Sequence, residues 1–207
     1  MTTRHLTYKF NIRTSIIKVI YPILTTLLLY SCYNEPSNKH SYEKNQIAKI
    51  SNDSIENNLK SQLKEYLTAF YGEDPETAIR YCYPDMFIWM KKNLPDDYNM
   101  DLVKDVFRET VRDIKRSAIK NNLTIKFEVG EITKKIDLET DKLYTVVVYF
   151  IAKKKFDEVK TGGEVIGISN DNGLNWKFLD KSSESAPDIL RMKFNESIVN
   201  QIMSENK

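Results

Sequence analysis

The sequence predicts an α+β fold, with N-terminal helices packed on a curved antiparallel sheet of about four strands and a further helix at the C-terminus. Two observations carry this prediction. Apolar residues recur at helical spacing as far as Lys120, whereas from Leu123 onwards they alternate with polar residues. Helices that precede a run of strands are typical of a sheet covered by a helical layer.

Three helices are expected before the sheet. The first has its N-cap at Asp53 or Ser54 and ends at Gly72. A short second helix starts at Asp74, which is a favourable N-cap residue followed by a proline. A longer amphipathic helix runs from about Met100 to Lys120. The apolar cluster 86–90, which follows an expected turn at 83–85, is predicted to be buried.

The strands are expected from residue 123 to residue 180. The first alternates from Leu123 to Val129 and bends at Gly130 before it continues. The run 143–152 is apolar on both sides in its middle, so it should lie inside the sheet. The lysines at 153–155 are typical of a strand end that is guarded against edge pairing.

The last hairpin contains the segment Ser-Asn-Asp-Asn-Gly-Leu-Asn-Trp at 169–176, which is similar to the Asp-box pattern of sialidase-type propellers, with Asn175 in place of the usual hydroxyl residue. In those propellers the motif recurs in each blade and is structural. It occurs once here, in a chain too short for a propeller. We interpret it as a structural hairpin rather than a binding site, held by four residues: Ser169, Asp171, Gly173 and Trp176.

The first 31 residues have the composition of a secretion signal. They contain four basic residues and no acidic one, and the uncharged run 19–31 is too short to cross a hydrocarbon core of about 30 Å. The run ends in Leu-Tyr-Ser-Cys at 29–32, which resembles the lipobox of bacterial lipoprotein signal peptides. The resemblance implies cleavage before Cys32, acylation of its thiol (as by palmitate) and a membrane anchor. The alternative is a short membrane anchor with a chance cysteine.

The resemblance divides the chain into a signal peptide (1–31), a lipidated cysteine with a flexible tether (32–53) and a folded domain (54–207). Tyr33 follows the cysteine where an inner-membrane retention signal would have Asp, so the cell outer membrane is the expected location. The short segment 53–55 (Asp-Ser-Ile) also resembles the O-glycosylation acceptor of Bacteroidetes-type envelopes.

Charge and residue types exclude several functions. The net charge of +2 depends on the leader, and the remaining residues carry 27 bases against 29 acids, so no nucleic-acid partner is expected. The only histidines, His5 and His40, precede the domain, which argues against a metal site, a cofactor or a histidine-based triad. Cys82 has no cysteine partner in the domain and is expected to be a small buried residue.

The order of elements and the opening LKEYLTAFYGEDPETAIRYCYPD resemble the nuclear transport factor 2-like fold, also called SnoaL-like, over residues 54–180. This cystatin-like cone encloses a pocket between helices and sheet. The resemblance implies a pocket lined by five aromatic residues: Tyr66, Phe70, Trp89, Phe107 and Tyr149. The alternative is that these rings fill the core.

The expected function is that of an envelope lipoprotein with a noncatalytic module that binds a partner protein or a small apolar ligand, an immunity or accessory lipoprotein among them. The alternative is a pocket enzyme of the isomerase or dehydratase type, whose relatives pair a tyrosine with acidic groups. No acidic residue is singled out on an inward strand face, since Glu128 and Glu164 point inward only if the register differs from the expected one. No catalytic residue is therefore assigned.

Overall fold

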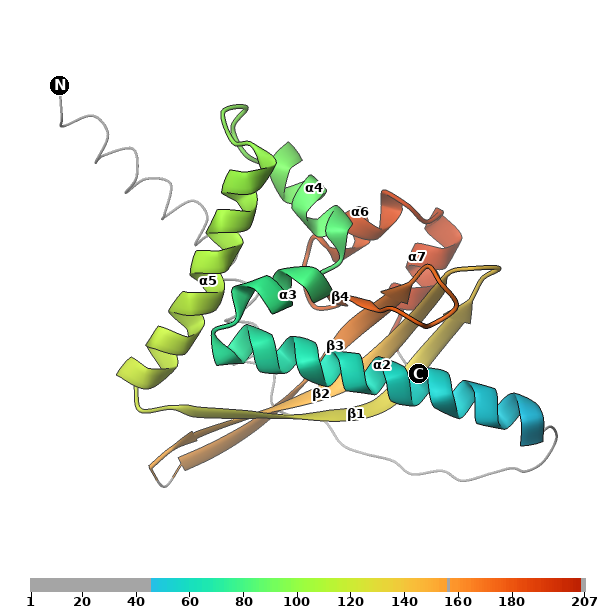
Figure 1. Cartoon of the computed structure of the whole chain (residues 1–207), viewed down its shortest axis with the longest axis horizontal. Coiled ribbons are helices and arrows are strands. Elements are labelled where there is room, and N and C mark those ends of the chain that lie inside the picture. Colours follow the sequence, from blue (N-terminus) through green and yellow to red (C-terminus); the bar gives the residue numbers. More distant parts are fainter. Residues whose placement is uncertain (1–45, 156, 206–207) are drawn as a thin grey trace. The chain divides into compact units, whose positions relative to one another are not determined.

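The computed structural model describes residues 46–155 and 157–205, and their side chains from residue 53 onwards. Four strands form one antiparallel sheet in the order β1-β2-β3-β4 (Figure 1). Helices precede the sheet and follow it, so the predicted α+β fold is confirmed. The elements are α2 (Gln46–Gly72), α3 (Pro75–Tyr81), α4 (Pro84–Lys92), α5 (Met100–Lys120), β1 (Thr124–Asp137), β2 (Lys142–Lys154), β3 (Asp157–Ser169), β4 (Lys177–Asp180), α6 (Ala186–Arg191) and α7 (Glu196–Met203).

Helix α2 begins earlier than the sequence pattern predicted. It starts at Gln46, so Asp53 and Ser54 lie inside the helix and the expected N-cap there is wrong. No glycine or proline occurs between Gln46 and Ser54, so nothing in the chain breaks the helix at this point. The last part of the expected tether is therefore helical, and the rest of the tether lies outside the described residues, as do Cys32 and the leader.

The other helix boundaries in this region follow their local signals. Helix α2 ends at Gly72, and Asp74 caps α3 by accepting a hydrogen bond from the Thr77 amide. Helix α5 has the predicted bounds and is capped by Asn99. Helix α4 begins at Pro84, so the turn expected at 83–85 is wrong, and burial of the apolar cluster 86–90 fails at Ile88, which is 40% exposed. Successive side chains of a helix point about 100° apart, so they cannot all face inward.

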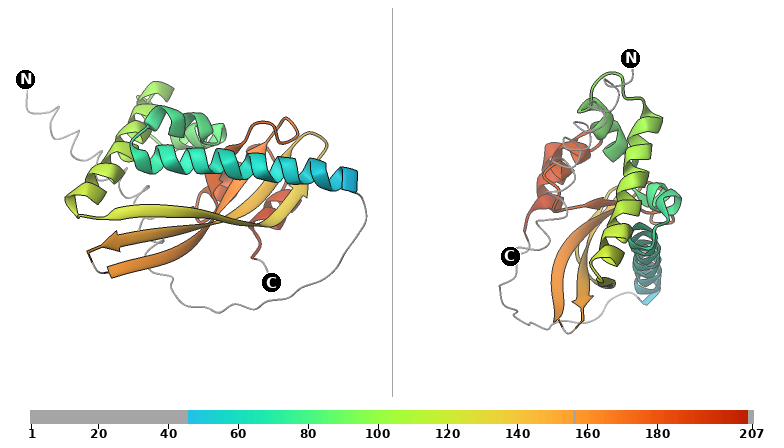
Figure 2. Two further views of the ribbon diagram at one scale, coloured as in Figure 1. Left: turned by 60° about the horizontal axis from the view of Figure 1, so that its bottom comes forward. Right: turned by 90° about the vertical axis from the view of Figure 1, so that its left-hand side faces the viewer.

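The two faces of the sheet are covered by different helices. Leu59, Leu63 and Leu67 of α2 pack on the face that carries Val146 and Phe178, and we call this the α2 face. Leu143 and Leu179 point to the opposite face and pack against α6 and α7. Figure 2 shows α2 and the α6–α7 pair on opposite sides of the sheet. Strand β2 is therefore interior, as its two-sided apolar pattern predicted.

A register shift between Val129 and Ile132 interrupts the pairing of β1 with β2, which confirms the expected bend at Gly130. A third core cluster lies among the helices themselves, where α3, α4 and α5 pack together around Phe87, Phe107 and Val111. Helix α2 contributes Ala69 to this cluster, so α2 packs against both the sheet and the other helices.

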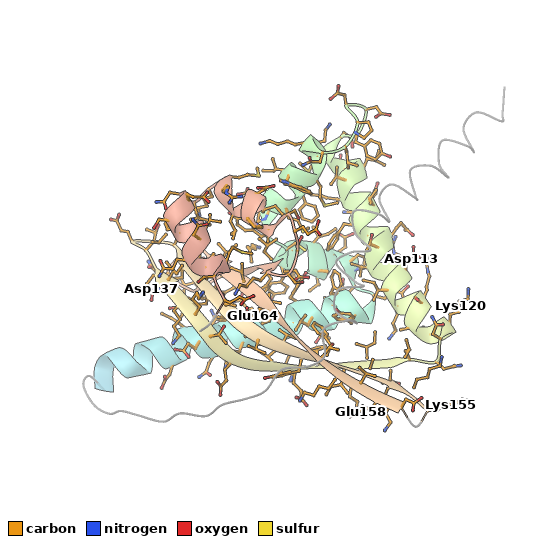
Figure 3. All side chains as sticks on the ribbon, turned by 180° about the vertical axis from the view of Figure 1, so that it is seen from behind. Asp113, Lys120, Asp137, Lys155, Glu158 and Glu164 are labelled. Carbon is orange, nitrogen blue, oxygen red and sulfur yellow. The ribbon has the colours of Figure 1, made fainter. Side chains whose placement is uncertain are left out.

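Two lysines hold the C-terminal end of α7 against the sheet. The Lys134 ammonium donates to the carbonyl oxygens of Gln201 and Ser204 at 2.8 and 2.7 Å. The buried Lys181 binds Glu164 at 2.6 Å and reaches the Ser204 carbonyl (Figure 3 labels Glu164). Burial and the nearby Lys181 charge lower the pKa of Lys134. These cations satisfy the free carbonyl groups at the end of the helix.

The Asp-box-like hairpin between β3 and β4 is closed by its own side chains. Asp171 Oδ1 accepts hydrogen bonds from the amides of Leu174 and Asn175 at 3.1 and 2.9 Å. Gly173 has a φ of 89°, and Trp176 is fully buried with its indole N–H donated to the Gly173 carbonyl. These contacts give the hairpin a structural role.

Helix α2 binds this hairpin directly. Asn58 donates to the carbonyl oxygens of Gly173 and Leu174, and Gln62 both donates to the Leu174 carbonyl and accepts from the Trp176 amide. The hairpin therefore fixes α2 along the α2 face as well as joining the last two strands.

Replacement of Asp171 by alanine should lower the free energy of unfolding by about 1–3 kcal/mol, because backbone donors of the turn lose their acceptor. Burial raises the pKa of Asp171, but hydrogen bonds from Asn175 and Ser169 outweigh it and lower the pKa overall. The stabilisation is thus present above the ordinary carboxyl pKa and is lost as the pH falls through the folded-state pKa.

Urea unfolding measured from about pH 7 down to about pH 2 should show the difference between the Asp171→Ala variant and the natural chain shrinking with acidity. The exposed Asp97→Ala is a matched control and should have little effect at any pH. An Asp171→Ala variant as stable as the control would contradict this role.

Candidate functional site

Asp180, the last residue of β4, is an acidic side chain on the α2 face. It pairs with Val165, and it lies two residues after Phe178, which packs beneath α2. Because side chains alternate along a strand, Asp180 shares the face of Phe178. Its Oδ1 atom accepts hydrogen bonds from the amide and hydroxyl of Ser182 at 2.9 and 2.7 Å. Asp180 is therefore an acidic residue on an inward strand face, which the sequence pattern did not single out.

The charge of the Asp180 carboxylate affects the pKa values of two tyrosines of α2. Burial raises the pKa of Asp180, although the Ser182 hydrogen bonds oppose the shift. Burial raises the pKa values of Tyr66 and Tyr71 as well, and the Asp180 charge adds to both shifts. A negative charge and two neutral phenol groups thus share one poorly solvated region.

A row of contacting rings runs from Tyr66 to strand β2. Tyr66 and Phe70 have centroids 5.8 Å apart, Phe70 and Tyr71 5.3 Å, and Tyr71 and Phe150 of β2 5.5 Å. These four rings and Asp180 all remain partly exposed, in contrast to the fully buried leucines of α2. We call the five residues the tyrosine–aspartate site: Tyr66, Phe70, Tyr71, Phe150 and Asp180.

Several polar atoms of the tyrosine–aspartate site have no hydrogen-bond partner among the described residues. The Tyr71 hydroxyl and Asp180 Oδ2 have none, and the Tyr66 oxygen only accepts a long contact of 3.8 Å from the Cys82 thiol. Within the described part of the chain, Thr145 carries the one fully buried side-chain polar atom that lacks a partner. The free atoms of the site are therefore open to water or to a ligand.

Cys82 itself is not a nucleophile in this arrangement. The thiol is 2% exposed and unpaired with any other cysteine in the described residues. Burial raises its pKa to about 12, despite the contact with Tyr66, so the reactive thiolate is absent at neutral pH. Its position beneath Tyr66 makes it part of the support of the site.

The structure brings together only part of the pocket lining expected from the sequence. Tyr66 and Phe70 belong to the site, and Phe107 lies behind Phe70 with its centroid 5.9 Å away. Trp89 packs against the core on the α6–α7 side of the sheet. Tyr149 points away from the α2 face, is 38% exposed and lies under the Lys160 ammonium at 4.6 Å.

Sequence reasoning missed Tyr71, Phe150 and Asp180. The period of two in the last strand contained the signal for Asp180, because Trp176 and Phe178 are large residues that must face inward and Asp180 continues their series. Glu128 and Glu164 do lie on the opposite face, as the expected register required, where Lys160 and Lys181 bind them.

No protein-family model matches this sequence, and no curated protein matches it. The resemblance to nuclear transport factor 2-like proteins therefore stays an expectation. Among residues 46–155 and 157–205, no three histidine, cysteine or acidic side chains gather as a metal ion requires. In the same part of the chain, every helix is too short or too polar to cross a bilayer.

The tyrosine–aspartate site has the composition of a small-molecule site. Apolar rings offer contact area, and a few polar atoms without partners can orient one polar group of a ligand. The carboxyl group of Asp180, with its raised pKa, can also exchange a proton more readily near neutral pH than an ordinary aspartate. Binding and acid–base chemistry are both compatible with this geometry.

Replacement of Asp180 by asparagine should stabilise the folded chain at about pH 7. Burial raises the pKa of Asp180 in the folded chain. Its contribution to the free energy of unfolding is therefore most favourable below the ordinary carboxyl pKa and becomes less favourable as the pH rises towards the folded-state pKa. Asparagine retains an oxygen that can accept from Ser182. The melting temperature should rise at about pH 7 and be unchanged at about pH 3.

Asp97→Asn, in an exposed turn, should leave the melting temperature unchanged at both pH values. A melting temperature that falls in the Asp180→Asn variant at neutral pH would show that the carboxylate stabilises the fold. That result would contradict the prediction that the ionised Asp180 lowers stability.

Proposed function

We propose that this protein is a lipid-anchored protein of the bacterial cell envelope whose domain binds a small, largely apolar ligand at the tyrosine–aspartate site. One observation carries the binding role: polar atoms of Tyr71 and Asp180 have no partner among the described residues although burial raises the pKa values of both groups. These atoms are not fully buried, since Thr145 carries the one fully buried side-chain polar atom without a partner in the described residues, so a ligand can reach them and pair with them.

A small ligand suits this site better than a partner protein. The rings of Tyr66, Tyr71 and Phe150 are half-buried between α2 and the sheet, whereas protein partners bind mainly exposed residues. The resemblance of residues 54–180 to nuclear transport factor 2-like proteins supports the same choice, because that fold holds its ligands between helices and sheet.

The membrane anchor rests on the leader. The basic residues before position 19, the apolar run 19–31 and Cys32 together match a lipoprotein signal peptide. Tyr33 favours the outer membrane as the location. In this arrangement the acyl chains on Cys32 hold the domain near the bilayer, where apolar small molecules accumulate.

Replacement of Cys32 by alanine should abolish incorporation of a radiolabelled or alkyne-tagged fatty acid when the full chain is expressed in a bacterium, because Cys32 is the thiol that directly follows the apolar run. Cys82→Ala is the matched control and should label like the natural chain, since its thiol is buried in the folded domain. Labelling that persists in the Cys32→Ala variant would contradict a lipid anchor at Cys32.

Replacement of Phe150 by alanine should weaken the binding of N-phenyl-1-naphthylamine, a neutral fluorescent apolar probe, by about tenfold, which corresponds to ~1.4 kcal/mol. The ring of Phe150 contacts Tyr71 within the site. Fluorescence titration of the full chain in phospholipid nanodiscs, with empty nanodiscs as the reference, measures the affinity.

The adjacent residue supplies the control for this test. Tyr149 lies on the same strand but points to the opposite face, so Tyr149→Ala should bind the probe as the natural chain does. Absence of saturable probe binding by the natural chain, or equal losses in the two variants, would overturn the binding role of the tyrosine–aspartate site.

A pocket enzyme of the isomerase or dehydratase type is the second candidate. The observation that favours it is that burial raises the pKa of Asp180, whose charge acts on Tyr66 and Tyr71, since a carboxyl group and a phenol in an apolar region can transfer protons to and from a ligand. Conversion of the bound molecule, seen by mass spectrometry of ligand recovered from the protein, would distinguish this function from simple binding.

A further inference from the structure

Strand β2 carries three apolar side chains outside the packed cores, on the face opposite to α2. Val147, Tyr149 and Ile151 alternate along the strand with the residues that face α2. Leu143 on the same face packs against α6 and α7, whereas these three side chains take no part in the core clusters of the described residues. All three are at least partly exposed, and Tyr149 is 38% exposed. We call these three residues the β2 row.

The surface beside Tyr149 is low because glycines flank its ring. Gly162 lies across from Tyr149 on β3, and a Cβ atom there would lie 3.6 Å from the ring. On β1, a Cβ atom at Gly130 would lie 3.2 Å from the same ring. The Lys160 ammonium, which is bound to Glu128, lies 4.6 Å from the ring centroid, so positive charge accompanies the exposed aromatic group. A broad, flat partner can therefore approach the β2 row.

Lysines without an ion pair lie at the Ile151 end of the β2 row. Lys126 of β1 lies directly across from Ile151, and lysines 153–155 follow at the end of β2. Lys120, the last residue of α5, lies at the same end of the domain (Figure 3 labels Lys120 and Lys155). All five lysines are exposed, and none of them forms an ion pair with the described residues.

Protection of a free sheet edge, which the sequence suggested for lysines 153–155, does not explain this cluster. Lys153 pairs with Thr124 on one side and with Glu158 on the other, so β2 has no free edge there. Asp157 and Glu158 also form no ion pair with the described residues and offset two of the five positive charges. The excess charge beside the β2 row is therefore positive.

We infer that the β2 row and its neighbouring lysines form a surface that binds the anionic phospholipid headgroups of a bilayer. Tyrosine is enriched at the interface between bilayer and water, and basic side chains near a bilayer attract anionic headgroups. Apolar side chains beside such lysines add contact with the acyl boundary. The inference goes beyond the proposed ligand binding, and it uses the proposed anchor only to bring the domain near a bilayer.

Other anionic partners fit this surface less well. Nucleic acid is bound through phosphate contacts and ring stacking, which leaves the aliphatic Val147 and Ile151 without a role. A partner protein would bury the β2 row without any need for anionic lipid, so lipid composition would not change the exposure of the lysines.

Lysine footprinting of the full chain tests the inference. The chain is mixed with nanodiscs of phosphatidylcholine, either alone or with about 30% phosphatidylglycerol, and treated with a short pulse of an acetylating reagent before mass spectrometry. Lys126 and lysines 153–155 should react at least about threefold more slowly with the anionic nanodiscs, and about 0.5 M salt should remove this difference. The exposed Lys64 and Lys92 should react equally in both. Equal rates for the first set of lysines would overturn the inference.

A double variant locates the effect. Lys126→Gln combined with Lys153→Gln should reduce the protection of Lys154 and Lys155 by at least about twofold, because fewer charges attract the headgroups. Lys64→Gln combined with Lys92→Gln is the matched control and should retain the full protection. Circular dichroism verifies that both variants are folded. Unchanged protection in the folded Lys126→Gln, Lys153→Gln variant would contradict the assigned surface.

The outcomes separate this inference from the proposed anchor. Fatty-acid labelling at Cys32 without lysine protection would leave the anchor standing and show that the surface is wrong. Lysine protection without labelling would support the surface and show that the anchor is wrong, since the lysines attract anionic lipid whether or not the chain is acylated.

Discussion

The packing of α2 on the central strands is the interaction on which the rest of this structure depends. The leucine face of α2 covers Tyr144, Val146 and Val148 of β2. The approach is close, since a Cβ atom at Gly167 of β3 would lie only 2.6 Å from the Leu59 methyl group. With Asn58 and Gln62 bound to the β3–β4 hairpin, the helix has one position along the sheet. Its last turns therefore place Tyr66 on Phe178 and Tyr71 on Phe150.

The acidic side chains on the two faces of the sheet have different partners. On the α6–α7 side, Glu164 is bound by Lys181, and Lys134 caps the end of α7. On the α2 face, Asp180 has only Ser182 as a polar partner among the described residues. The first arrangement stabilises the docking of a helix, whereas the second leaves the Asp180 charge without a cationic partner among the described residues. Groups left unsatisfied in this way are typical of functional sites, where stability is given up for binding.

Much of the fold was predictable because its signals are local. The bounds of α5, the end of α2 at Gly72, the Asp74 cap and the bend at Gly130 each follow from residues within a turn or two. The start of α2 was not predictable in the same way, since cap-forming residues are also tolerated inside a helix when no glycine or proline interrupts it. The site was predicted only in part: Tyr66 and Phe70 belong to it, but Trp89 and Tyr149 lie elsewhere.

The sequence by itself determined the α+β class, the charge balance and the absence of histidine from the domain, because these depend on composition and on short-range periodicity. The resemblance of the leader to a lipoprotein signal peptide also depends on the sequence alone, because it rests on contiguous residues. Tertiary structure alone decided that Tyr71 packs on Phe150 and that the Asp180 charge acts on Tyr66 and Tyr71, since these residues come from α2, β2 and β4. Register selects which face each strand residue occupies, and the position of α2 selects which of those residues become a site.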